Sequence, residues 1–129
     1  AHVVGYAVGL DLTRRHLQFD AREHGRPWDV AKGFDCSAPV SAIRPAAEMR
    51  HPEQGAIWLE VNGETRQRAN LSEMIWNVPE IVAELSTYFE LRPGDLIYTG
   101  TPEGVGPVQR GDSLVGGIDG LETLRITIV

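Results

Sequence analysis

Residues 56–68 read AIWLEVNGETRQR, and this stretch decides the fold more than any other part of the chain. Large apolar side chains alternate at Ile57, Leu59 and Val61, which is the period of a half-buried strand. Asn62-Gly63 follows directly, and this pair readily adopts the positive φ values of a tight hairpin turn. We therefore predict a β-hairpin over Ala56 to Arg68.

Further strands are predicted on both sides of the hairpin. Val3 to Leu10 alternates small and larger apolar residues, which indicates a strand with one face open to close approach. The turn residues Pro93-Gly94-Asp95 precede a short strand, Leu96 to Tyr98, and the Gly/Pro-rich loop Thr99 to Pro107. Apolar residues then alternate from Leu124 to Ile128 as a final strand.

One amphipathic helix is predicted, from Pro79 to Tyr88. Proline suits a first helical turn, and apolar residues recur at three- and four-residue spacing through this segment. Leu71 to Trp76 indicates a short preceding turn of helix. Because this helix does not recur between the strands, the pattern favours an α+β or mixed-β architecture over a repeated βαβ sheet.

Composition narrows the class of protein. At 129 residues and 14.2 kDa the chain has the size of one domain, and its 42% hydrophobic content is ordinary for a soluble protein. We expect no membrane partner, because no apolar run approaches the length of a bilayer-spanning helix. A net charge of −6 argues against nucleic acid as a partner. The single cysteine, Cys36, excludes an internal disulfide and favours a reducing compartment, so we expect a cytoplasmic protein.

Three features could carry chemistry, and each also has a plain structural interpretation. Asp11 ends the first predicted strand, where its carboxylate could bind a hard metal ion or could cap the next turn. Lys32 lies among apolar neighbours, where it could stabilise an oxyanion or could be a surface lysine. The loop Thr99 to Gly106 could hold a carboxylate with its backbone N–H groups or could be an ordinary turn.

Four blocks of sequence, taken together and in this order, closely resemble the catalytic domain of the fumarylacetoacetate hydrolase family. The resemblance covers essentially all 129 residues, and its most specific part is the TGTP-x-GVG signature after the PGD turn. Within the family, the sequence most resembles the small acylpyruvate and fumarylpyruvate hydrolases. The blocks are GYAVGLDLTRR at residues 5–15, PW with AKGFD within residues 27–35, VNGE with RQ within residues 61–67, and PGDLIYTGTPEGVG at residues 93–106.

The resemblance implies a fold and an assembly. The fold is the α+β C-terminal domain of the family, a mixed β-sheet roll or barrel-like structure with one main amphipathic helix. Residues 1–129 would form a single domain that lacks the N-terminal part of the family domain. Homodimers are common in the family, so a homodimer is expected.

The resemblance also implies an enzyme that hydrolyses a carbon–carbon bond in acylpyruvate-type 2,4-dioxo acids and releases pyruvate and a carboxylic acid. Asp11 matches the aspartate that binds Mg²⁺ (or Mn²⁺), and Lys32 matches the lysine that steadies the substrate oxygens. Arg15 and Gln18 match polar residues that face the same pocket. Gly100 and Thr101 match the loop that holds the carboxylate of the small 2-oxo acid substrate.

The sequence departs from the family pattern in its metal ligands. The family supplies two more ligands from a Glu-x-Glu pair, which this chain does not contain, and water-activating His and Glu residues from an N-terminal lid. We therefore expect a fragment of a longer enzyme or a degenerate member. Two alternative functions stay open: oxaloacetate decarboxylase or 2-oxo acid hydratase/isomerase activity of the same family, and a catalytically inactive binding module.

Overall fold

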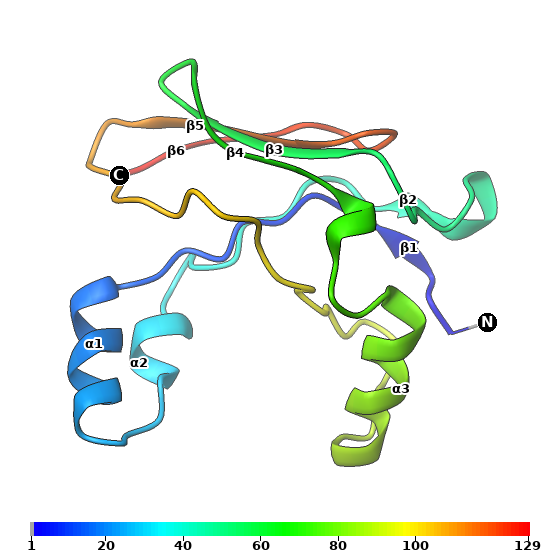
Figure 1. The fold of residues 1–129 in the computed structure, drawn as a ribbon, viewed down its shortest axis with the longest axis horizontal. Helices are drawn as coiled ribbons and strands as arrows, with labels where there is room; N and C mark the ends of the chain where they lie inside the picture. The colour runs from blue at the N-terminus through cyan, green and yellow to red at the C-terminus, as the bar shows by residue number, and fades with distance from the viewer. Residues whose placement is uncertain (1) are drawn as a thin grey trace.

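The main structural layer is a four-stranded antiparallel sheet with the strand order β4-β3-β5-β6. The computed structural model describes residues 2–129. The predicted hairpin is confirmed: β3 (Ala56–Val61) and β4 (Glu64–Asn70) pair antiparallel, and Asn62 and Gly63 have φ values of 54° and 82°. β5 (Ser113–Ile118) and β6 (Leu124–Thr127) complete the sheet, as Figure 1 shows.

The N-terminal segment is extended but is only partly a strand. Within Val3 to Leu10, the regular pairing is limited to β1 (Gly5–Tyr6) against β2 (Arg44–Pro45), with one further bridge between Gly9 and Val40. Hydrogen bonds from Ser41 N to Val8 O (2.9 Å) and from Leu10 N to Pro39 O (3.0 Å) continue the pairing at intervals. Prolines in the partner segment lack the N–H that a regular ladder requires, so the prediction of one continuous strand is wrong.

The predicted helix is confirmed as α3 (Val78–Tyr88). The Asn77 side chain accepts a hydrogen bond from Glu80 N at 2.9 Å, and the Glu80 carboxylate accepts one from Asn77 N at 2.8 Å. This reciprocal capping box satisfies two of the free N–H groups at the start of the helix. The short turn of helix predicted before α3 is present as η2 (Leu71–Glu73).

Two helices, α1 (Arg15–Glu23) and α2 (Asp29–Lys32), and two strands, β2 and β5, were not predicted. The two helices lie against each other, and neither has a side-chain N-cap that would mark its start in the sequence. β5 contains Gly116 and Gly117, which interrupt the alternation of large residues. Conversely, Leu96 to Tyr98 forms no strand pairing among residues 2–129, which corrects that prediction. A short 3₁₀ helix, η1 (Ala46–Glu48), follows β2.

The elements form an open arrangement. In Figure 1 the sheet lies across the top, α1 and α2 extend from one end, and α3 extends from the other. The α+β class is confirmed. None of the helices in residues 2–129 has the length and apolar character needed to cross a bilayer. The fully buried apolar side chains are few and mostly small: Val8, Ala21, Ala31, Val61, Leu114 and Leu124.

The accessible surface is large for the mass of the chain. It measures 9412 Å², whereas a compact protein of 14.2 kDa exposes about 6,800 Å². Several large apolar side chains contribute to this excess, including Ile75 at 96% exposure and Phe89 at 64%. The folded chain therefore leaves substantial apolar surface in contact with solvent.

Substituting Gly117 by alanine tests how closely the sheet is packed. A Cβ at Gly117 would lie 2.8 Å from Nε1 of Trp58, its cross-strand partner, and closer still to two ring carbons. We expect Gly117→Ala to lower the free energy of unfolding by about 1–3 kcal/mol, measured by urea denaturation of the full-length protein, because the half-buried ring must move to make room for the added Cβ.

The neighbouring Gly116 provides the matched control. A Cβ there would approach Leu10 Cδ2 to 3.4 Å and Val8 Cγ1 to 3.5 Å, which are ordinary contacts. Gly116→Ala should change the free energy of unfolding by less than about 1 kcal/mol. Equal losses in the two variants would contradict the proposed packing of Trp58.

Candidate functional site

Asp11 and Lys32 form the centre of the candidate site. The Lys32 ammonium donates to Asp11 Oδ2 at 2.6 Å and to Thr13 Oγ1 at 3.0 Å. Both charged side chains keep access to solvent, with exposed fractions of 34% for Lys32 and 49% for Asp11. The contact bears on both simpler interpretations. Asp11 does not cap α1, whose N-cap is Arg14, and Lys32, the only lysine of the chain, is not a free surface lysine.

Backbone pairing brings these two residues together across the 21 positions that separate them in the sequence. Leu12 N donates to Ser37 O at 2.9 Å, and Arg14 N donates to Ala31 O at 3.0 Å. Ala31 is fully buried beneath this crossing, so its small side chain allows α2 to approach. The Arg14 guanidinium also lies over the Phe34 ring, 4.4 Å from its centroid. Asp11 and Lys32 are therefore held by a fixed crossing of two segments.

Arg15 and Gln18 lie in the first turn of α1. Arg15 Nη1 donates to Gln18 Oε1 at 2.7 Å, and Gln18 is buried. The helix begins four residues after Asp11, so Arg15 and Gln18 belong to the same stretch of chain that positions Asp11. The predicted residues Asp11, Lys32, Arg15 and Gln18 thus come from one unit, the paired segments that end in α1 and α2.

Gly100 and Thr101 lie in a separate loop that is attached to β4. Gly100 has a φ of 115°, which L-residues with side chains rarely adopt. Gln67 Nε2 donates to Thr101 Oγ1 at 2.8 Å and to Pro102 O at 2.6 Å. A Cβ at Gly104 would collide with the Arg66 carbonyl oxygen, so the loop lies directly on the strand.

Sequence reasoning did not assign a role to Gln67. It lies directly opposite Leu59 in the hairpin and is buried. Directly opposed residues share one face of a sheet, so a glutamine opposite an apolar residue is a polar group turned toward the interior. The β-bulge between Leu59 and Glu60 creates this register, because uninterrupted pairing from Val61 and Glu64 would place Gln67 opposite Trp58. The sequence pattern alone therefore contains no signal for the role of Gln67.

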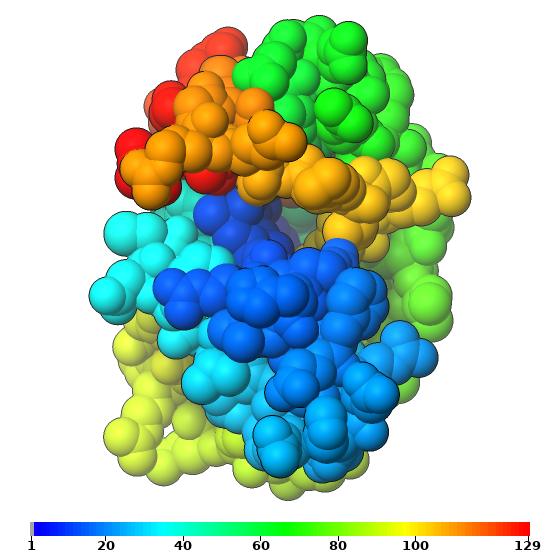
Figure 2. Space-filling view, turned by 90° about the vertical axis from the view of Figure 1, so that its left-hand side faces the viewer, coloured from blue at the N-terminus to red at the C-terminus, as the bar shows by residue number. Residues whose placement is uncertain are grey.

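Tyr98 connects the loop with the ion pair. Its hydroxyl donates to Ala38 O at 2.8 Å, and its ring packs on Gly9, where a Cβ would lie 2.6 Å from Cε1. Burial raises the pKa of the Tyr98 phenol, and the negative charge of Asp11 raises it further. The residue before the loop is therefore held against the paired segments that carry Asp11. In Figure 2 the surface is hollowed between the blue N-terminal segment and the yellow-to-orange loop segment.

The described residues supply only part of a metal site. Within residues 2–129, no group of three or more His, Cys, Asp or Glu side chains is arranged to hold an ion. Asp11 offers one carboxylate, and its Oδ2 already accepts from Lys32. Mg²⁺ is often bound by one or two carboxylates together with water and substrate oxygens. Asp11 fits the role of one ligand, and the remaining ligands must come from elsewhere.

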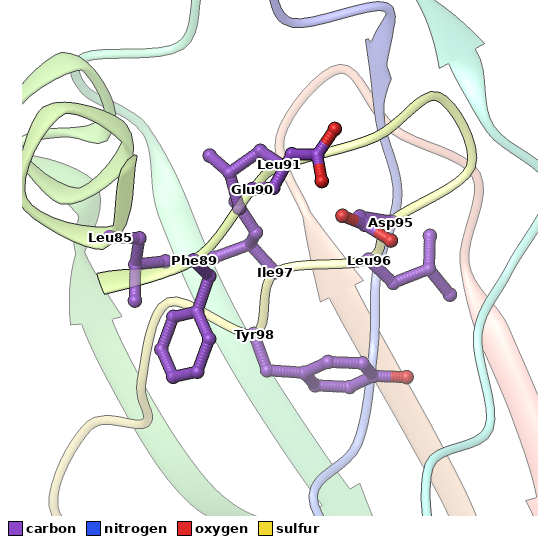
Figure 3. A pocket seen from close by; sticks show the side chains of 8 residues that line it. All are labelled: Leu85, Phe89, Glu90, Leu91, Asp95, Leu96, Ile97 and Tyr98. Atoms are coloured by element: carbon purple, nitrogen blue, oxygen red, sulfur yellow. The ribbon is translucent and has the colours of Figure 1, made fainter. Parts of the chain in front are cut away.

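A second depression lies between α3 and the segment that follows it. This groove of about 500 Å³ is lined mainly by apolar side chains, among them Leu85, Phe89, Leu91 and Leu96. Figure 3 shows Leu85 and Phe89 on the α3 side of the groove. Its carboxylate Asp95 accepts a hydrogen bond from Arg92 N at 2.7 Å, within its own turn. The lining is suited to apolar packing and not to an anionic substrate.

Comparison with known proteins matches all of residues 1–129 to the family described as fumarylacetoacetate (FAA) hydrolase, C-terminal. The chain is 53% identical over 126 residues to a fumarylpyruvate hydrolase of Ralstonia sp, covering 98% of the chain and 65% of that protein. It is 45% identical over 127 residues to the mitochondrial oxaloacetate tautomerase FAHD1 of Arabidopsis thaliana, covering 98% of the chain and 57% of the relative.

A solved structure shows the same fold. It is the fumarylpyruvate hydrolase from Pseudomonas aeruginosa in complex with Mn²⁺ and pyruvate, with a TM-score of 0.97 and 56% identity. The alignment covers 99% of this chain and 55% of the solved chain. The chain thus spans between about half and two thirds of the length of these three relatives.

The Tyr98 pKa tests the closeness of the loop to Asp11. A nearby negative charge disfavours the phenolate, so Asp11→Asn should lower the pKa of Tyr98, although burial keeps it above the ordinary value. The measurement is an NMR titration of the Tyr98 ring, assigned with Tyr98→Phe. Asp20→Asn, an exposed carboxylate on α1, is the control. An unchanged Tyr98 pKa in Asp11→Asn would mean that the loop does not lie beside Asp11.

Proposed function

The chain belongs to the fumarylacetoacetate hydrolase family, and we propose that the protein containing it hydrolyses a carbon–carbon bond of fumarylpyruvate or a closely related acylpyruvate. In this reaction, water adds to the distal acyl carbonyl carbon and the bond from that carbon to C3 breaks. The electron pair stays on C3 as the enolate of pyruvate, which then takes up a proton. The products are pyruvate and a carboxylic acid, which is fumarate for fumarylpyruvate.

The single observation that carries this proposal is the geometry around Lys32. An ammonium has three N–H donors, and two of them are engaged by Asp11 at 2.6 Å and by Thr13 at 3.0 Å. One donor remains on a side chain that is still accessible to solvent. A fixed donor with a positive charge is suited to the oxygen on which negative charge develops as the enolate forms.

Asp11 is proposed as one ligand of Mg²⁺ or Mn²⁺. The Mn²⁺ and pyruvate bound in the Pseudomonas aeruginosa relative support this assignment. When bound, such an ion would polarise the substrate oxygens and stabilise the enolate charge. Asp11 would also fix the Lys32 ammonium, because the charge-assisted hydrogen bond orients both side chains.

The substrate is an anion, and the remaining site residues fit that charge. Arg15 uses Nη1 to bind Gln18, which leaves other guanidinium N–H groups for a substrate oxygen. Gly100 and Thr101 are proposed to hold the carboxylate of the 2-oxo acid, since a small residue with positive φ exposes backbone N–H groups at close range.

Oxaloacetate tautomerisation is the second candidate function. It is favoured by the 45% identity to the oxaloacetate tautomerase of Arabidopsis thaliana. The chemistry is related, because tautomerisation passes through the enolate of the 2-oxo acid, which carries its negative charge on the same oxygen that Lys32 would contact. Product analysis separates the candidates: hydrolysis yields two acids, tautomerisation leaves the mass unchanged, and decarboxylation of oxaloacetate releases CO₂.

Residues 1–129 are proposed to be one part of a larger catalytic domain. The accessible surface exceeds that of a compact protein of the same mass by about 2,600 Å². The three relatives carry further sequence outside the aligned region, which could supply cover for the exposed apolar side chains and the missing metal ligands. A cytoplasmic homodimer is also part of the proposal, and subunit pairing would cover some of the same surface.

Two substitutions in the full-length protein test the site. We expect Asp11→Asn and Lys32→Ala each to lower kcat/KM for fumarylpyruvate by about 100-fold or more, because each removes charge stabilisation of the enolate. The assay follows the ultraviolet absorbance of the 2,4-dioxo acid at fixed Mg²⁺. Chelation of divalent ions should abolish turnover by the wild-type protein.

Asp20→Asn makes the same chemical change at an exposed position of α1 and should retain activity. Unchanged kcat/KM in either Asp11→Asn or Lys32→Ala would show that the site is assigned wrongly. Rapid equilibration of oxaloacetate tautomers by a wild-type protein that leaves fumarylpyruvate intact would replace the first function by the second.

The domain proposal predicts a difference between the 129-residue chain and the full-length protein. The isolated chain should bind a hydrophobic fluorescent dye strongly, because its apolar surface is exposed, and should unfold at lower urea concentration. The full-length protein should bind little dye. Equal dye binding and equal unfolding midpoints would mean that nothing outside residues 1–129 covers this surface.

A further inference from the structure

The position of Gln67 fixes the direction of two hydrogen bonds. Its terminal amide approaches the Pro102 carbonyl oxygen at 2.6 Å and the Thr101 hydroxyl oxygen at 2.8 Å with the same nitrogen. A backbone carbonyl oxygen only accepts hydrogen bonds, so the amide group that faces Pro102 must be the NH₂ group. The two N–H bonds of Gln67 therefore point to Pro102 and Thr101, and the amide cannot be reversed without placing two oxygens in contact.

This direction determines what the Thr101 hydroxyl can do. A threonine hydroxyl has one hydrogen to donate, and here its oxygen accepts from Gln67. The hydrogen of the hydroxyl is consequently directed away from Gln67 and is available to an acceptor outside the strand. Thr101 is exposed, so a ligand oxygen can reach it.

We infer that Gln67 is a positioning residue that directs the hydroxyl hydrogen of Thr101 toward a carboxylate or carbonyl oxygen of the ligand. This inference rests on the proposed function, because it specifies how the loop at Gly100 and Thr101 recognises a 2-oxo acid. Gln67 does not touch the ligand. Because the Thr101 oxygen accepts from Gln67, its hydrogen stays available to a ligand oxygen, which favours an anionic or carbonyl acceptor.

The surroundings of Gln67 make this arrangement rigid. Gln67 is buried on β4 between Arg66, whose carbonyl oxygen lies against Gly104, and Arg68, which pairs with Trp58 in the sheet. The Gln67 side-chain amide donates to Thr101 and Pro102 of the loop. Sheet, glutamine and loop therefore form one continuous hydrogen-bonded unit, so the Thr101 hydroxyl needs little reordering when a ligand binds.

Two substitutions of similar size at Gln67 separate the effect of its hydrogen-bond donors from the effect of its packing. Gln67→Glu presents an oxygen to Thr101, so the hydroxyl would donate inward to the carboxylate and be lost to the ligand. Gln67→Met removes the donors without adding charge, which leaves the hydroxyl free to rotate. We expect the Kd for pyruvate, measured by calorimetry with Mg²⁺ on the full-length protein, to rise more than about 10-fold in Gln67→Glu and less in Gln67→Met. KM should rise in the same order, with a smaller change in kcat.

A double-mutant cycle with Thr101 tests the positioning role directly. Thr101→Val should weaken pyruvate binding by itself, Thr101→Ser should restore it, and Gln67→Glu should add little in the Thr101→Val background. Gln54→Glu adds the same charge at an exposed position and should leave the Kd for pyruvate unchanged. Urea unfolding of each variant measures any separate loss of stability.

An effect of Gln67→Glu that persists in full in the Thr101→Val background would overturn the inference, as would an unchanged Kd in Gln67→Glu. If Gln67→Glu fails to fold, the same cycle is run with Gln67→Met. An effect of Gln67→Met on the pyruvate Kd that persists in full in the Thr101→Val background would likewise overturn the inference. Turnover of fumarylpyruvate by the wild-type protein is measured separately. If the protein binds pyruvate but does not hydrolyse fumarylpyruvate, the proposed function is wrong. The inference about Gln67 is then judged by the pyruvate Kd values of the variants alone.

Discussion

The crossing of the segment before α1 with α2 and the segment that follows it is the constraint on which the rest of the structure depends. Hydrogen bonds at Leu12 and Arg14 attach these segments to each other, and the buried Ala31 lets them approach. The crossing places a carboxylate on one segment within 2.6 Å of an ammonium on the other. Without it, Asp11 and Lys32 would be independent surface charges, and such charges interact weakly in water.

The sheet and the loop depend on a second constraint, the close approach of aromatic rings to glycines. Tyr98 packs on Gly9, and Trp58 packs on Gly117. Each contact requires the absence of a side chain at the glycine, because an added Cβ would overlap ring atoms. These contacts connect the N-terminal segment to the loop and β3 to β5. They explain why small residues occupy positions in extended segments where larger ones would give better strand propensity.

The sequence predicted the elements that depend on local signals. Asn62-Gly63 determines the hairpin through backbone conformation, and the Asn77 capping box and following apolar spacing determine α3. The missed elements depend on distant partners. β5 contains two glycines whose role is visible only when Trp58 lies over one of them. The site behaves likewise: Asp11 and Lys32 were candidates from their sequence context and received roles through family resemblance, while Gln67 and Thr101, 34 positions apart, are connected only in three dimensions.

The ion pair and the loop at Thr101 are held by different parts of the chain, which affects how related enzymes can diverge. The ion pair is held by the segment before α1 and by α2, whereas the loop at Thr101 is held mainly by β4. Mutations that reshape one support need not disturb the other. Under the proposed function, selection can keep a shared enolate chemistry while it changes which acids are accepted, so that one ancestral scaffold gives rise to catalysts that differ in their products.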